Sequence, residues 1–181
     1  MTVKPSKAIA FCFALAGVGV AFAQSAAAQS AERVASHTDW SVFVAAQPKE
    51  CYIVSPPSAS SATRDGKPTE VQRGDIRLFV AFRPGENVSN EVSFTGGYPF
   101  REGSSVSLAV GSDRFNLGPG AGDAGEWAWT DPSDDSRVVA ALRRGSSAKV
   151  TGTSTRGTQT EDTFSLAGFT AAVEDAAARC R

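Results

Sequence analysis

The sequence predicts a mainly β protein: an antiparallel β-sandwich or open barrel of about eight strands with two short helices, one of them C-terminal. Three observations carry this prediction. Short runs that alternate apolar and polar residues, as half-buried strands do, recur along the chain. Helical spacing replaces this pattern only near residues 131–144 and near the C-terminus. With 41% hydrophobic and 20% charged residues among 181, the chain has enough apolar content for one core.

Residues 1–28 are predicted to be a secretory signal peptide. Two lysines precede an uncharged apolar run over residues 8–23, and small residues then offer cleavage after Ala23 or after Ala28. A membrane anchor is the alternative, but the apolar run is shorter than the roughly 20 residues that a span needs. We therefore expect an exported chain with no membrane span left after cleavage. Its mature part would be mildly acidic, because cleavage removes two lysines and no acid.

The cysteine count indicates a disulfide. Cleavage removes Cys12 and leaves Cys51 and Cys180 in a chain bound for an oxidising space, where an even number of cysteines is typical of a bridge. Such a bridge would join the last helix to an early strand. A redox-active thiol is the alternative, but neither cysteine lies in a C-x-x-C motif or near a histidine that would stabilise a thiolate.

The mature chain is expected to begin with a flexible leader, residues 29–38, followed by one β-rich domain, residues 39–181. The strands expected in this domain cover residues 39–44, 51–54, 76–82, 90–94, 105–110, 114–117, 149–153 and 162–166. The strand over residues 76–82 is the most apolar and should be central, with its even-numbered residues on one face. Residues 56–74 are rich in serine, threonine, glycine and proline, and are predicted to be a long exposed loop.

Helix signals flank the last two strands. Asp131 is expected to cap the first helix, with Pro132 at its first position, and Gly145 is expected to end it. Thr170 is expected to cap the second helix, whose four-residue spacing of small residues directs Cys180 toward the core.

The composition argues against nucleic-acid binding and against most metal sites. A formal net charge of −1 provides no basic field for a nucleic acid. A single histidine excludes every site that needs two. We predict no cofactor, no metal site and no catalytic residue.

Several motifs resemble those of enzymes without predicting catalysis. The glycine-rich segment 118–125 could cradle a phosphate, but no Gly-Lys-Ser/Thr follows it, so a flexible loop is expected. Ser146 and Lys149 have the Ser-x-x-Lys spacing of penicillin-recognising enzymes, but the partner motifs are missing. His37 has no nucleophile motif beside it and is expected to be exposed. An envelope hydrolase with an unrecognised serine-based site, such as Ser146 with Lys149, is kept as the alternative function.

Three aspartates and two tryptophans each allow two interpretations. Asp131, Asp134 and Asp135 could bind calcium, but they lack the alternating spacing of a calcium loop, and capping of the helix explains them better. Trp127 and Trp129 alternate on one strand, so they either pack in the core or form an aromatic platform that could stack on sugars. We regard them as a candidate binding surface.

The segment Gly152–Ala172, followed by Cys180, resembles the C-terminal signature of the invasion-associated locus B family, which comprises exported proteins of α-proteobacteria. Earlier features agree with this resemblance over nearly all of the mature chain. They are Trp40 shortly before Cys51, the stretch Asn90–Ser93, the tripeptide Gly97-Tyr98-Pro99 and the helix end Ala141–Gly145. Tyr98 of the tripeptide joins the two tryptophans as a candidate binding residue.

The resemblance implies a periplasmic, outer-membrane-associated or secreted protein whose relatives in pathogens are linked to host-cell entry. No catalytic residues are established for the family, so none is carried over. We therefore expect a non-enzymatic protein that binds an envelope or host-surface protein or glycan. Its oligomeric state does not follow from the sequence.

Overall fold

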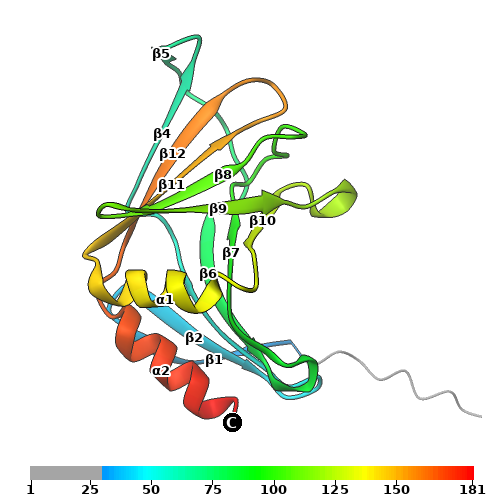
Figure 1. Cartoon of the computed structure of the whole chain (residues 1–181), viewed down its shortest axis with the longest axis vertical. Coiled ribbons are helices and arrows are strands. Elements are labelled where there is room, and N and C mark those ends of the chain that lie inside the picture. Colours follow the sequence, from blue (N-terminus) through cyan, green and yellow to red (C-terminus); the bar gives the residue numbers. More distant parts are fainter. Residues whose placement is uncertain (1–29) are drawn as a thin grey trace, which may run out of the picture.

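The computed structural model describes residues 30–181, which form one antiparallel sheet of 12 strands and two helices (Figure 1). The expected signal peptide, residues 1–28, lies outside the described residues. The strands are β1 Glu32–His37, β2 Trp40–Ala45, β3 Glu50–Ser55, β4 Ala59–Arg64, β5 Lys67–Pro68, β6 Arg77–Arg83, β7 Val88–Thr95, β8 Val106–Val110, β9 Asp113–Pro119, β10 Trp127–Thr130, β11 Ser147–Thr153 and β12 Gln159–Ser165. The helices are α1 Asp135–Arg144 and α2 Phe169–Arg179, and two 3₁₀ turns are η1 Pro84–Glu86 and η2 Gly122–Ala124.

The sheet is open and strongly curled (Figure 1). Its strand order is β1-β2-β3-β6-β7-β10-β9-β8-β11-β12-β4-β5, so β1 and β5 form the two ends. The curl brings Phe94 of β7 and Phe164 of β12 into edge-to-face contact, with ring centroids 6.1 Å apart. The prediction of a mainly β antiparallel fold with two helices is confirmed, but the predicted number of about eight strands is wrong.

The strands that the sequence did not predict lie in segments of small and polar residues, in which apolar and polar positions do not alternate. Residues 32–37, expected to be part of a flexible leader, pair with β2 as strand β1. Within the predicted loop 56–74, β4 pairs with β12 and then turns back through β5. Backbone hydrogen bonds hold both segments, and these bonds do not depend on apolar side chains. Only Ala62 of β4 is buried, which explains why alternation did not reveal the strand.

Both helices begin at other residues than predicted. Asp131 accepts hydrogen bonds from the backbone nitrogen and the hydroxyl of Ser133, 2.9 and 2.6 Å away, and so organises a turn ahead of α1 instead of capping it. For α2 the N-cap is Gly168, not Thr170, with φ +86°. A Cβ at Gly168 would lie 2.0 Å from the His37 carbonyl oxygen, so β1 packs against this helix start at a distance that only glycine permits.

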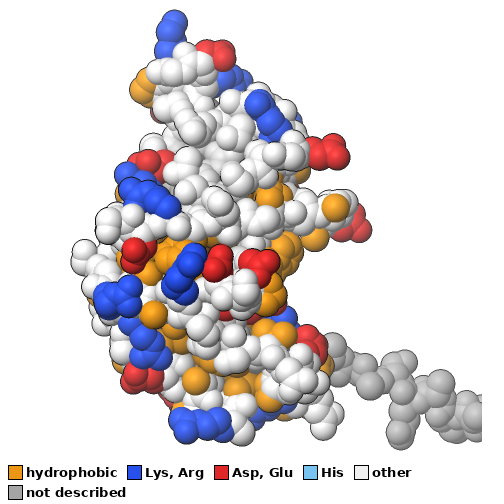
Figure 2. All heavy atoms as spheres, viewed as in Figure 1, with side chains coloured by type: hydrophobic (Ala, Val, Ile, Leu, Met, Phe, Trp, Pro, Cys, Tyr) orange, Lys and Arg blue, Asp and Glu red, His pale blue; other side chains and the backbone are white. Residues whose placement is uncertain are grey.

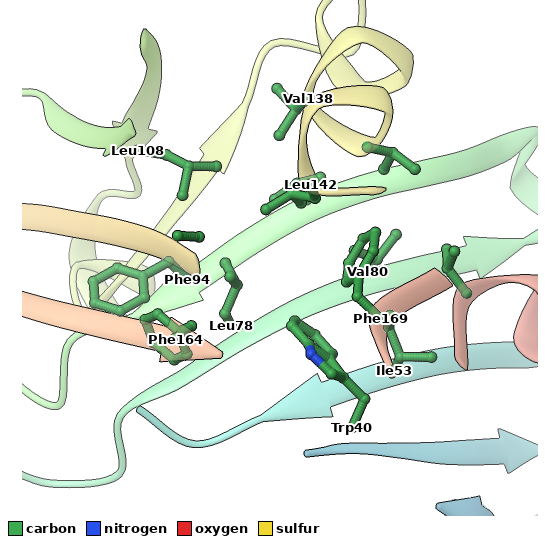
Figure 3. Close-up of a cluster of buried hydrophobic side chains, with 14 of the residues drawn as sticks. Trp40, Ile53, Leu78, Val80, Phe94, Leu108, Val138, Leu142, Phe164 and Phe169 are labelled. Carbon is green, nitrogen blue, oxygen red and sulfur yellow. The ribbon is translucent and has the colours of Figure 1, made fainter. Parts of the chain in front are cut away.

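The core lies between the sheet and the helices, as the buried side chains in Figure 3 show. Trp40 is fully buried, meets Phe169 edge-to-face at 5.0 Å and donates its indole N–H to the Ser165 carbonyl at 3.0 Å. On the central strand β6 the even-numbered Leu78, Val80 and Phe82 are buried, as the alternation predicts.

A disulfide joins Cys51 of β3 to Cys180, directly after α2, across 129 positions of sequence. The predicted pairing is confirmed, and the bridge is buried beside the carbonyl of Phe82.

No helix within residues 30–181 has the length and apolar character needed to cross a membrane.

Candidate binding groove

Five aromatic side chains form a row on the sheet face opposite the helices. They are Phe43 of β2, Tyr52 of β3, Phe79 of β6, and Trp127 and Trp129 of β10, all partly exposed. Consecutive ring centroids in this order lie 5.1, 6.0, 5.3 and 6.1 Å apart. The platform that the two tryptophans suggested is therefore part of a longer row across four strands.

Strand alternation places these rings. On β10, Ala128 and Thr130 are buried in the core, so Trp127 and Trp129 point to the opposite face. Between β6 and β10, strand β7 contributes Ser93, whose Cα pairs with both Phe79 and Trp129. Because serine is small, the rings on either side can approach each other over β7.

Four of the five rings, all except that of Phe43, line the floor of a groove with a volume of about 530 Å³. We define the aromatic groove by its floor of Tyr52, Phe79, Ala81, Ser93, Trp127 and Trp129, its charged end of Glu50, Arg83 and Glu91, and a wall of Asp123 and Ala124. In Figure 1 the β9–β10 connection with η2 projects beyond the sheet above the β6–β7 turn, and Figure 2 shows the surface hollowed between these projections.

Glycine shapes the wall of the groove. A Cβ at Gly120 would lie 2.5 Å from the Ala124 carbonyl and 3.0 Å from the Trp129 ring, while its nitrogen donates to the Trp127 carbonyl at 2.8 Å. The glycine-rich segment 118–125, expected to be a flexible loop, thus continues β9 and then folds back over β10 through η2.

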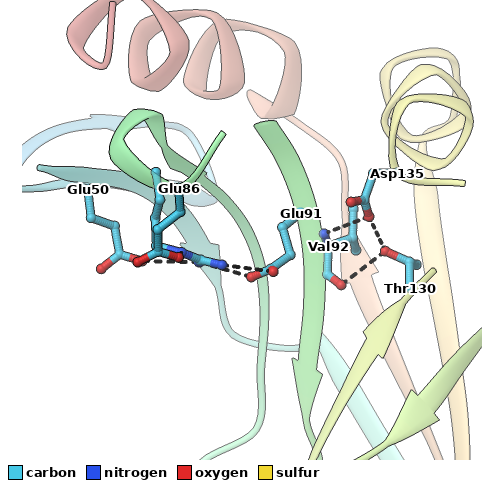
Figure 4. Close-up of polar contacts among 7 residues, drawn as sticks. Glu50, Glu86, Glu91, Val92, Thr130 and Asp135 are labelled. Carbon is cyan, nitrogen blue, oxygen red and sulfur yellow. Dashed lines mark hydrogen bonds and ion pairs between the residues drawn. The ribbon is translucent and has the colours of Figure 1, made fainter. Parts of the chain in front are cut away.

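Carboxylates surround the only guanidinium that lines the groove. Arg83 donates from both terminal nitrogens to the two Glu91 oxygens, at 3.0 and 2.9 Å, and from Nε to Glu86 at 2.8 Å (Figure 4). Glu50 lies 3.6 Å from the same guanidinium. Hydrogen bonding to Glu91 is the main reason why the pKa of Arg83 is raised. Burial, with a contribution from the Glu50 charge, raises the pKa of the Tyr52 hydroxyl.

Asp135 lies on the other side of β7. Its carboxyl accepts the Val92 backbone N–H at 3.2 Å and contacts the Thr130 hydroxyl (Figure 4). Burial raises its pKa, although these hydrogen bonds act in the opposite direction. The interpretation of Asp135 as a charge at the helix start is therefore incomplete, because the first turn of α1 packs onto β7 and buries it.

The calcium interpretation of the three aspartates has no support in this arrangement. Asp131 binds Ser133, Asp134 pairs with Arg137 at 3.2 Å, and Asp135 binds Val92 and Thr130. Their partners differ, and within residues 30–181 no group of three His, Cys, Asp or Glu side chains is arranged to hold a metal ion.

Tyr98 lies outside the aromatic groove. Its hydroxyl is 2.6 Å from that of Thr160, and the Arg73 guanidinium lies 5.0 Å from its ring centroid. Burial raises the pKa of Tyr98. Arg73 in turn binds both oxygens of the fully buried Asp162, at 2.8 and 2.7 Å. Tyr98, which is partly exposed, therefore lies apart from the tryptophans and lines a second hollow of about 520 Å³ together with Arg73 and Thr160.

The remaining motif residues form no common site. Ser146 precedes β11 and Lys149 lies within it, paired with Glu161 at 2.9 Å, so the pair lacks the helix that Ser-x-x-Lys chemistry uses. His37, expected to be exposed, is only partly so, and its Nε2 lies 3.1 Å from an Asp175 oxygen. Arg179 and His37 both bind Asp175 and lower its pKa.

Sequence reasoning did not identify Tyr52 and Phe79 as groove residues, or Phe43 as part of the aromatic row. The signal was present: each directly follows a buried residue on its strand, so each must point to the face opposite the core. What the sequence could not supply is the strand order that sets β2, β3, β6 and β10 in one row.

A model of the family described as invasion associated locus B (IalB) protein matches residues 73–177, more than half of the chain. The chain belongs to this family. The matched region of this IalB family member contains the groove residues from Phe79 to Trp129, whereas Tyr52 and both bridged cysteines lie outside it.

A solved structure shares the fold of this IalB family member. It is the crystal structure of invasion associated protein B from Bartonella henselae, with a TM-score of 0.52 and 20% sequence identity, covering 83% of this chain and 97% of that chain. At this identity the likeness concerns the fold alone. No curated protein matches the chain.

Proposed function

We propose that this IalB family member is an exported, non-enzymatic envelope protein that binds a partner through the aromatic groove. The partner is a protein or a glycan of the envelope or of a host surface. Binding would take place in the periplasm, at the outer membrane or outside the cell. The row of five partly exposed rings carries this proposal.

The chemistry of the row supports binding. Aromatic side chains offer large contact areas at a low cost in side-chain entropy, and they are enriched in the energetically important centres of interfaces. The groove volume of about 530 Å³ falls in the usual range of ligand sites. Since the core needs none of these rings, their position on the opposite face favours a role in recognition.

A hydrolase is not developed as a second candidate. Lys149 is paired with Glu161, and Ser146 lies directly before β11, outside the residues that line the groove. No observation within residues 30–181 therefore favours the serine-based site that the sequence left open.

Two capture experiments test the binding role. One uses a detergent extract of the bacterial envelope, and the other uses a detergent extract of host-cell surfaces. We expect the native protein to retain a defined protein or glycan, and the Trp127→Ala/Trp129→Ala variant to lose most of it. The matched control is Val34→Ala/Val71→Ala, which removes two other exposed hydrophobic side chains, 37% and 39% exposed, away from the groove. Equal retention by both variants, with native circular dichroism, would contradict the proposal.

The export part of the proposal is tested by the intact mass of protein recovered from cells. We expect cleavage after Ala23 or Ala28, in a fraction released from the periplasm or held at the outer membrane. A full-length mass in the cytosolic fraction would contradict export.

A further inference from the structure

The charges around the aromatic groove are unequal. Three carboxylates line it, those of Glu50, Glu91 and Asp123, against the single guanidinium of Arg83, which leaves a formal excess of two negative charges. Glu86, just outside the lining, adds a further carboxylate on Arg83. An apolar floor beside excess carboxylates creates a negative potential in a partly water-excluded hollow.

The guanidinium is not available to an anionic ligand. Arg83 uses Nε and both terminal nitrogens on Glu86 and Glu91, and its side chain is only 23% exposed. Glu50 is more accessible: its side chain is 33% exposed, and within residues 30–181 its one ion-pair partner is Arg83, at 3.6 Å. Within residues 30–181, Asp123 on the opposite wall takes part in no ion pair, and it is exposed.

From this arrangement we propose that the aromatic groove binds a cationic segment of a partner protein, one that carries lysine or arginine side chains. The proposal rests on the proposed function and specifies the partner's chemistry. The aliphatic stem of such a side chain would lie across Phe79 and the tryptophans, and its charge would reach Glu50 or Asp123.

The same charges disfavour the other classes of partner. A phosphorylated or sialylated glycan would bring negative charge to a groove whose lining guanidinium, Arg83, is already bound by carboxylates, which is a repulsive contact. A neutral glycan would stack on the rings but gain nothing from the excess charge. A basic peptide gains from both the apolar floor and the carboxylates.

Fluorescence anisotropy of a labelled peptide provides the test. The probe is a decapeptide of alternating lysine and proline, which stays extended. The comparison probes replace each lysine by acetyl-lysine or by glutamate, and chitotetraose represents a neutral glycan. We expect the lysine peptide to bind about tenfold more tightly than the acetyl-lysine peptide, with affinity falling as sodium chloride rises from 50 to 300 mM. We expect no binding of the glutamate peptide.

Two variants locate the site. Glu50→Gln/Asp123→Asn removes two groove carboxylates and should lower the affinity for the lysine peptide about fivefold to tenfold. Asp65→Asn/Glu102→Gln is the matched control, because it removes the same charge from exposed residues outside the groove and should leave affinity unchanged. Binding should also shift tryptophan emission, since Trp127 and Trp129 line the groove and the third tryptophan, Trp40, is fully buried.

Each outcome bears on the inference. Equal binding of lysine and acetyl-lysine peptides, equal losses in the two variants, or binding of chitotetraose without the peptide would overturn it. If the lysine peptide does not bind while capture from extract still depends on Trp127 and Trp129, the inference of a cationic partner is wrong and the proposed binding role stands. If the peptide does not bind and capture does not depend on these tryptophans, both the inference and the proposed function are wrong.

Discussion

At the scale of single residues, Asp135 is an acid whose ionisation should weaken folding. Burial raises its pKa in the folded chain above the ordinary value of about 4 that it has when unfolded. A raised pKa means that the folded state holds the proton more tightly. The stabilisation linked to this proton is fully present below about pH 4 and is lost as pH rises through the folded pKa.

Comparison with Asp135→Asn isolates this effect, because asparagine keeps an oxygen that can accept the Val92 N–H but cannot ionise. We expect the free energy of unfolding of the native protein to fall relative to that of the variant between pH 3 and pH 7. Urea titrations at each pH measure the difference. A difference that grows in favour of the native protein as pH rises would show that the sign is wrong.

The buried pair of Arg73 and Asp162 should make a large contribution when one partner is removed. Their side chains are 7% and 0% exposed, and Asp162→Asn would leave the guanidinium without its counter-charge. We expect a loss of about 3 to 5 kcal/mol in the free energy of unfolding. Glu161→Gln on the same strand breaks an exposed pair with Lys149 and should cost less than about 1 kcal/mol. Similar losses in urea unfolding would contradict the argument.

Residue-level prediction succeeded where a residue count or the spacing along one strand decided the outcome. The cysteine count sufficed for Cys51 and Cys180, and alternation placed Trp127 and Trp129 on one face. It did not show that Asp135 packs on β7, or that Tyr98 lies beside Arg73 and β12 and away from the tryptophans, because these neighbours are distant in sequence. The order of residue types along the chain does not show which distant residues become neighbours in the fold.

At the scale of elements, the start of α2 against β1 depends on Gly168. Alanine there would incur the cost of a left-handed backbone, about 1 to 2 kcal/mol, and would also collide with the His37 carbonyl. Gly66→Ala is the matched control, since Gly66 has φ +73° but no heavy atom within 4 Å of the position that a Cβ would take. We expect Gly168→Ala to lower the melting temperature distinctly more than Gly66→Ala. Equal shifts would show that the collision is relieved without cost.

The strongly apolar elements could be predicted, and the polar ones could not. Strand β6 and helix α1 bury apolar side chains at the period that the sequence displays. Strands β1 and β4 bury almost none and are held by pairing to β2 and β12. Their existence depends on unpaired backbone edges of neighbouring strands, which is a property of the assembled sheet.

At the scale of the whole molecule, the disulfide closes nearly all of the domain into one loop of 129 positions. Restricting the unfolded chain in this way should stabilise the fold by about 2 to 5 kcal/mol. We expect Cys51→Ala/Cys180→Ala to lose this amount in urea unfolding. Reducing agent should destabilise the native protein and leave the double variant unchanged. A variant as stable as the oxidised native protein would contradict the prediction.

The bridge also determines how the domain would respond to mechanical force. If tension is applied ahead of β1 and beyond Cys180, it passes from Cys51 through the sulfur–sulfur bond, and residues 52–179 bear no load. Only β1, β2 and the first residue of β3 can be peeled away, which extends the chain over residues 31–50 by roughly 70 Å at most. The strands from Tyr52 to Trp129 that form the groove floor would keep their arrangement under tension. A protein held between two surfaces could therefore be stretched without losing the floor of its groove, although Glu50 at the charged end lies in the stretched segment.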